Sequence, residues 1–126
     1  MERAVEIFAL VQFTVIGLSH VFAPRAWVRF FVWLRDKGEP GVFVFAFLTL
    51  WFGSIIAAFH NVWSGWPAVL TFLGWAQVLK GALYFIFPSF GLKMLGQVSE
   101  DRVHHFVIGG VLMLLAVALL GWHLLR

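Results

Sequence analysis

The sequence predicts an all-α integral membrane protein, a single transmembrane domain built as a four-helix bundle. Hydrophobic residues make up 62% of the 126 residues and charged residues only 12%, which is too apolar for a small soluble domain. Four apolar stretches each approach the roughly 20 residues that cross a ~30 Å hydrocarbon layer as a helix. Backbone groups in lipid must be paired internally, and four such runs are too few and too long for a barrel, so we expect helices.

The spans are expected at about residues 4–22, 41–60, 67–87 and 103–125. The first contains Glu6 as its only charged residue, and we expect Glu6 to stay in the interface beside Arg3. The second contains no charge, the third contains Lys80 alone, and the fourth has only histidines as titratable groups.

Between the first two spans, residues 24–36 form a pattern typical of an amphipathic helix in the membrane interface. Its apolar positions follow i, i+3, i+4, i+7 spacing, and its basic positions are expected to contact lipid headgroups. The apolar set is Trp27, Phe30, Phe31 and Leu34, and the basic set is Arg25, Arg29 and Arg35.

The charge distribution predicts the orientation. The long segments 23–40 and 88–102 carry most of the basic residues, which are Arg25, Arg29, Arg35, Lys37, Lys93 and Arg102. By the positive-inside bias these segments are cytoplasmic and both termini lie outside. Trp63, Trp66 and Trp122 fall near the opposite boundary, as expected for an aromatic belt.

The two halves of the chain resemble each other at an offset of 64 residues. Gly17 and Pro24 align with Gly81 and Pro88, and three further positions agree or are chemically similar. These are Phe8 with Phe72, Arg29 with Lys93, and Asp36 with Glu100; a weaker apolar face also recurs at Gly91, Met94, Leu95 and Val98. One interpretation is a bundle of two parallel two-helix repeats. The other is that glycine and proline, which are frequent in membrane helices, recur at this offset by chance.

Lys80 is the strongest candidate for a functional residue, because it lies about 10 Å inside the third span at 1.5 Å per residue. Gln77, Lys80 and Tyr84 share one helical face. Together with Gln12, Ser19 and Thr49 on other spans they could line a polar cavity for an anion, a carboxylated solute or a lipid headgroup. The alternatives are that Lys80 snorkels to the interface and that the polar groups only join helices by hydrogen bonds.

Five histidines suggest a second kind of site. His20, His104 and His105 approach the cytoplasmic boundary, and His60 and His123 approach the outer one. Each boundary therefore has histidines on two helices at similar depth, the minimum for ligating haem b through two imidazoles. The competing interpretation treats them as solvated interfacial residues, with His60 marking a helix end.

The sequence lacks the residues that several classes of function require. The chain has no cysteine, which excludes disulfides, thiolate nucleophiles and cysteine-ligated clusters. No metal-ligand, phosphate-binding or Ser-His-Asp pattern is visible, so an enzyme is not favoured. The net charge of +3 arises from membrane-flanking residues without a polybasic tract, so we expect anionic lipid rather than nucleic acid as the partner.

Residues 60–88 resemble an uncharacterised family of small four-span bacterial membrane proteins. The shared pattern is His-Asn-x-Trp at an outer turn, then Gly-Trp, Lys-Gly and proline, here His60, Asn61, Trp63, Gly74, Trp75, Lys80, Gly81 and Pro88. The resemblance implies a bacterial cytoplasmic membrane and brings no established activity.

Three functions remain open. The favoured one is a structural or accessory subunit that acts through helix packing and lipid contact, with a membrane-protein partner or further copies of itself. The first alternative is a homo-oligomeric transporter or channel centred on Lys80. The second is a haem b or lipid-handling membrane protein.

Overall fold

All four predicted spans are helices in the computed structural model, which describes residues 2–125. They are α1 (Glu2–Phe22), α3 (Glu39–Phe59), α4 (Pro67–Ile86) and α6 (Val103–Leu125). Each is long and apolar enough to cross a membrane, and the described part of the chain contains no strand. The all-α membrane bundle is therefore confirmed, with boundaries within two residues of those expected.

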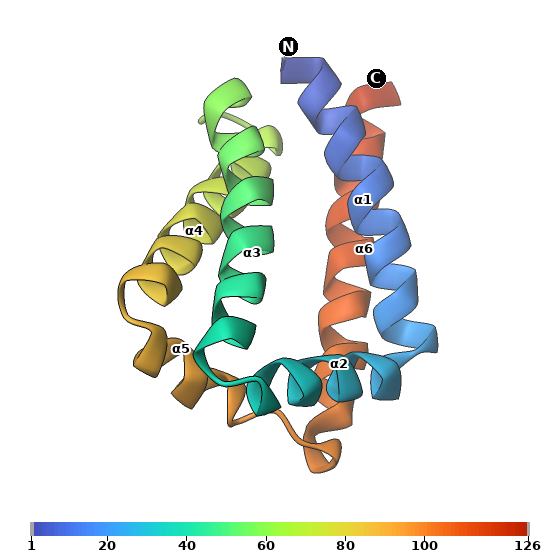
Figure 1. Cartoon of the computed structure of the whole chain (residues 1–126). Helices are drawn as coiled ribbons and strands as arrows, with labels where there is room; N and C mark the ends of the chain where they lie inside the picture. The colour runs from blue at the N-terminus through green and yellow to red at the C-terminus, as the bar shows by residue number, and fades with distance from the viewer. Residues whose placement is uncertain (1, 126) are drawn as a thin grey trace.

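Three short helices connect the spans at the end opposite the termini (Figure 1). α2 (Pro24–Asp36) has the predicted bounds, whereas α5 (Pro88–Leu95) stops before Val98, and a 3₁₀ turn, η1 (Glu100–Arg102), precedes α6. α2 and α5 each begin with proline, whose ring lacks the N–H that the first helical residue would leave unpaired. The chain can therefore turn sharply from a span into an interfacial helix.

The four spans pack as two antiparallel pairs rather than as an evenly packed bundle. α1 lies along α6, and α3 lies along α4, while contacts between the two pairs are sparse (Figure 1). The α2 helix contacts both α3 and α6 and so joins the pairs at their far end. Inside each span's most apolar stretch only 17% to 33% of residues are buried, so most of the surface is left to lipid.

Glycine allows the close approach within each pair. A Cβ atom on Gly110 of α6 would lie 2.7 Å from the carbonyl oxygen of Gly17 on α1. In the other pair, a Cβ atom on Gly53 would lie 2.8 Å from the carbonyl oxygen of Gly74. Small residues at helix crossings let backbones pack closely where no hydrophobic effect drives association. Gly109, in contrast, faces open space.

The order of helices repeats along the chain at the offset seen in the sequence. α1, α2 and α3 correspond to α4, α5 and α6, and both α1 and α4 run from the terminal end toward the short helices (Figure 1). The packing partners of the two glycines correspond in the same way. Gly17 packs against Leu114, and Gly81 packs against Leu50. Gly81 follows Gly17 by 64 residues, and Leu114 follows Leu50 by 64 residues. The two units therefore run in the same direction, and each contains one short α-helix besides the two spans that the sequence predicts. Duplication of the sequence itself stays a prediction.

Two buried apolar clusters lie at opposite ends of the bundle. The cluster nearer the short helices contains Leu34, Val42, Ala46, Tyr84 and Leu95. The cluster nearer the termini contains Val5, Ala9, Ile56, Leu70 and Leu120, and so includes residues from both helix pairs. Val5 and Leu70 of this second cluster directly precede Glu6 and Thr71, two residues of the candidate site.

Candidate functional site

Three buried polar side chains meet near the terminal end of the bundle. Glu6 comes from α1, His60 follows the last residue of α3, and Thr71 belongs to α4. The exposed fraction is 5% for Glu6 and 0% for both His60 and Thr71. His60 Nδ1 lies 2.8 Å from Thr71 Oγ1, and His60 Nε2 lies 3.2 Å from Glu6 Oε2. We call these three residues the polar network.

The turn after α3 fixes the imidazole ring of His60. The backbone of His60 is extended, with φ of −139°, and its N–H donates to the Ile56 carbonyl as α3 ends. Asn61 donates from its side chain to the Ala57 carbonyl and accepts a hydrogen bond from Trp75 Nε1. The His-Asn pattern of the sequence is therefore a helix end held on both sides, as expected for His60.

Thr71 is held by the same turn. Its hydroxyl lies 2.8 Å from the carbonyl oxygen of Val62, and it accepts a hydrogen bond from the Val62 N–H at 3.1 Å. Thr71 thus connects α4 to the segment after α3 and positions His60 at the same time.

A second histidine lies on the other side of Glu6. His123 Nε2, on α6, is 3.7 Å from Glu6 Oε1, and the His123 side chain is 43% exposed. Glu6 therefore lies between one fully buried imidazole of the α3/α4 pair and one accessible imidazole of its own pair. The polar network spans the boundary between the two helix pairs.

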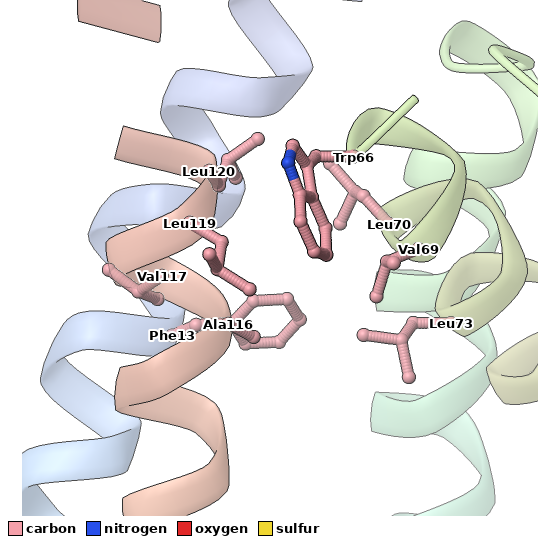
Figure 2. A pocket seen from close by; sticks show the side chains of 9 residues that line it. All are labelled: Phe13, Trp66, Val69, Leu70, Leu73, Ala116, Val117, Leu119 and Leu120. Atoms are coloured by element: carbon pink, nitrogen blue, oxygen red, sulfur yellow. The ribbon is translucent and has the colours of Figure 1, made fainter. Parts of the chain in front are cut away.

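An apolar cleft lies directly beside the polar network. Figure 2 shows its walls: side chains of α6 and α1 on one side and of α4 and the residue before it on the other. The lining residues are Phe13, Trp66, Val69, Leu70, Leu73, Ala116, Val117, Leu119 and Leu120. The cavity volume is about 60 Å³. Leu70 and Leu120 belong both to this cleft and to the apolar cluster nearer the termini.

Lys80 lies away from the polar network, on the α3/α4 pair. Its ammonium group is 4.9 Å from the ring centroid of Phe45 and 5.9 Å from that of Tyr84. The Lys80 side chain is exposed, Gln77 is half-buried and Tyr84 is buried. The structure thus brings Lys80 and Tyr84 together, as their shared helical face predicts.

The other polar residues of the predicted cavity are divided between the two helix pairs. Thr49 is buried on α3, whereas Gln12 and Ser19 are half-buried on α1. Ser19 accepts a hydrogen bond from Trp27 Nε1 at 2.8 Å, which fixes α2 against the end of α1. A cavity formed by all six residues remains a prediction.

The histidines lie in different surroundings. His60 and His123 approach the same carboxylate, but both ring nitrogens of His60 already have partners. His20 is buried, with Nδ1 2.8 Å from the Ile16 carbonyl and its ring stacked on Trp27, while His104 and His105 are exposed. Iron ligation by His60 would break a buried hydrogen bond. Among residues 2–125, no three His, Asp or Glu side chains are arranged to hold a metal ion.

The arginines of α2 differ in their roles. Arg25 and Arg29 are exposed, as headgroup contact requires. Arg35 is half-buried and donates from Nη1 to the Val98 carbonyl at 3.1 Å, so it joins the two connecting segments that follow α1 and α4.

Sequence reasoning missed most of the polar network. The expectation that Glu6 stays beside Arg3 in the interface is wrong, because the carboxyl group is buried against His60. Thr71 carries no distinguishing sequence signal, since threonine is common in membrane helices as a packing residue. The available signal was a single acidic residue in the first span at the same expected depth as His60 and His123.

Comparison of the chain with protein-family models, with curated proteins and with solved structures finds no match.

Proposed function

We propose that this chain is a small membrane subunit that acts through helix packing and lipid contact, with the cleft between α4 and α6 seating one hydrocarbon chain of a lipid. The single observation that carries the proposal is the parting of the two helix pairs beside a wall of apolar side chains. A span surrounded by lipid has lipid as its most abundant neighbour, so an apolar opening at this depth fills with acyl chain.

The size of the cleft favours a chain segment over a compact ligand. A cavity of about 60 Å³ is small beside the roughly 300–1,000 Å³ of ordinary small-molecule pockets. A haem or a folded metabolite requires far more room, whereas a few methylene groups of a linear chain need little. Every lining residue is apolar or aromatic, so the cleft offers a hydrocarbon chain contacts without desolvating charge.

The terminal end of the cleft offers polar contacts for a headgroup. His123 follows Leu120 by three residues and Leu119 by four, so its side chain continues the cleft-facing side of α6 by one turn. Trp66 lines the cleft at the same end and is 54% exposed. Tryptophan prefers the headgroup level of a bilayer, which fits a lipid whose polar end lies there.

The charges suggest which leaflet supplies the lipid. Arg25, Arg29 and Lys93 are exposed at the end formed by α2 and α5, away from both termini. The positive-inside bias assigns that end to the cytoplasm of a bacterial cell. The termini and the cleft then lie toward the outer leaflet.

Filling the cleft tests this proposal. Ala116→Phe adds a ring at the cleft wall, whereas Ala118→Phe adds the same ring on an exposed position of the same helix. We expect purified Ala116→Phe protein to retain less bound phospholipid in native mass spectrometry than the parent, and Ala118→Phe protein to match the parent. Equal lipid retention by the two variants would exclude the cleft as the lipid site.

A partner subunit is the other half of the proposal. The exposed apolar flanks of the spans would accept a membrane-protein partner or further copies of this chain. Cross-linking in native membranes followed by mass spectrometry tests it: recovery of a stoichiometric partner or a defined homo-oligomer supports the subunit role, and a monomer with lipid alone contradicts it.

A further inference from the structure

We propose that Glu6 and His60 form a proton-binding site that holds one proton between the Glu6 carboxyl group and His60 Nε2, and that this proton latches the two helix pairs together. The inference stands on the hydrogen-bond geometry of the polar network and is independent of lipid in the cleft.

The hydroxyl group of Thr71 fixes where the His60 protons lie. A threonine hydroxyl has one proton to donate. That proton goes to the Val62 carbonyl, because the two oxygens are 2.8 Å apart and a carbonyl can only accept. The 2.8 Å contact between Thr71 Oγ1 and His60 Nδ1 must then be a hydrogen bond donated by Nδ1–H. The network thereby assigns the tautomer of His60.

The tautomer of His60 determines whether a proton must lie between His60 Nε2 and the Glu6 carboxyl group. If His60 is neutral with its proton on Nδ1, Nε2 has only a lone pair and cannot donate. A hydrogen bond at 3.2 Å then requires a proton, either on Glu6 Oε2 or on Nε2 of an imidazolium. In both cases the pair is neutral overall and contains one proton more than an ionised carboxylate beside a neutral imidazole.

The surroundings favour this neutral pair. Glu6 is 5% exposed, and both His60 and Thr71 are 0% exposed, so little water can solvate a bare carboxylate here. An uncompensated charge in such a place is costly.

The other ionisable groups near Glu6 and His60 do not supply the proton of the hydrogen bond between these two residues. On α1, Glu2 and Arg3 are exposed, and on α4 the nearest is Lys80, nine residues beyond Thr71, about 13 Å along the helix. His123 on α6 is the one further titratable side chain within 4 Å of Glu6 among the described residues. Because His123 is accessible, it provides the route by which protons reach the buried pair.

The pair also occupies a structural junction. Among hydrogen bonds of the described side chains, Glu6 to His60 is the one that joins the α1/α6 pair to the α3/α4 pair. Without the proton, the Nε2 lone pair would face the carboxylate, and the contact would become repulsive. The form in which this hydrogen bond joins the two helix pairs therefore binds one proton more than a form in which the pairs have moved apart. Lowering the pH then favours the joined form.

Solid-state ¹⁵N NMR of labelled protein in bilayers tests the proton site. We expect His60 to show a protonated Nδ1, either in a neutral ring beside a protonated Glu6 or in an imidazolium. A neutral His60 ring protonated at Nε2 alone would overturn the assignment.

Distance measurements test the latch. The chain lacks cysteine, so spin labels at Ala58→Cys on α3 and Ala118→Cys on α6 report only the separation of the pairs. We expect this distance to increase with pH in the otherwise unchanged protein. Glu6→Gln supplies an N–H to Nε2 without a titratable proton, so its distance should stay short at every pH. Two results would contradict the proposal: a spin-label distance that does not change with pH in the parent protein, or one that changes with pH in Glu6→Gln as much as in the parent.

Discussion

Replacing Thr71 by valine removes one hydroxyl from the centre of the polar network while keeping the shape of the side chain. The hydroxyl lies within 3.1 Å of three polar atoms: His60 Nδ1, the Val62 N–H and the Val62 carbonyl oxygen. His60 is fully buried, so its Nδ1–H loses its partner without access to water. Val62 is half-buried, so water can replace part of what it loses.

These exposures set the magnitude of the effect. A buried donor left without a partner costs about 1–3 kcal/mol. Hydrogen bonds between membrane helices average only about 0.6 kcal/mol by mutation, because the unfolded helices also find partners in the membrane. We therefore expect Thr71→Val to lower the free energy of unfolding by about 1–3 kcal/mol, toward the upper figure if His60 cannot reorient.

The control is the same substitution on α1. Thr14 donates only to the Leu10 carbonyl one turn earlier, a bond that adds to a carbonyl already inside the helix. Thr14→Val should change the free energy of unfolding by less than about 0.5 kcal/mol. Reversible unfolding in mixed detergent micelles, followed by circular dichroism, measures both. A Thr71→Val protein as stable as Thr14→Val would refute the account of the polar network.

Three further predictions concern packing, Lys80 and the connecting segments. Gly110→Val should force α6 away from the α1 backbone and lower the free energy of unfolding by about 2 kcal/mol or more, whereas Gly109→Val, which meets open space, should be nearly neutral; thermal unfolding compares them. Lys80→Met should change the free energy of unfolding by less than about 1 kcal/mol, because the ammonium group lies over aromatic rings at an exposed position. If this folded variant loses an uptake or a conductance that the parent has, the result would instead support transport. Arg35→Met should speed hydrogen exchange in residues 96–102 by removing the bond to Val98, and Arg29→Met should leave that exchange unchanged.

Sequence reasoning predicts the spans and the interfacial helix because both depend on local patterns. A run of apolar residues near the bilayer thickness has one backbone solution in lipid. A proline followed by apolar residues at helical spacing likewise fixes the start and the face of α2. Neither inference requires knowing which helix packs on which.

The pairing of helices and the polar network could not be obtained in this way. Glu6 and His60 are 54 residues apart, and their contact depends on how α1 crosses the end of α3. The depth of Glu6 alone suggested a solvated interface, since an isolated acidic residue near a terminus can reach water cheaply. A partner from another helix reverses that argument, because it satisfies the carboxyl group inside the protein.

Lys80 illustrates the opposite case. Its depth in the third span made it the leading candidate, but depth does not say which side of a helix faces lipid. The structure places the ammonium over Phe45 at an exposed position, where an aromatic face and a flexible stem accommodate the charge.

Photo-labelling with a phospholipid that carries a diazirine in its acyl chain tests the lipid-contact account most directly. The account predicts, above the general labelling of lipid-facing surfaces, a strong and saturable signal on the cleft residues Trp66, Leu73 and Leu119, which an excess of unlabelled lipid reduces. Uniform labelling that includes Leu79 and Ile86, exposed residues outside the cleft, with no enrichment in the cleft, would contradict it.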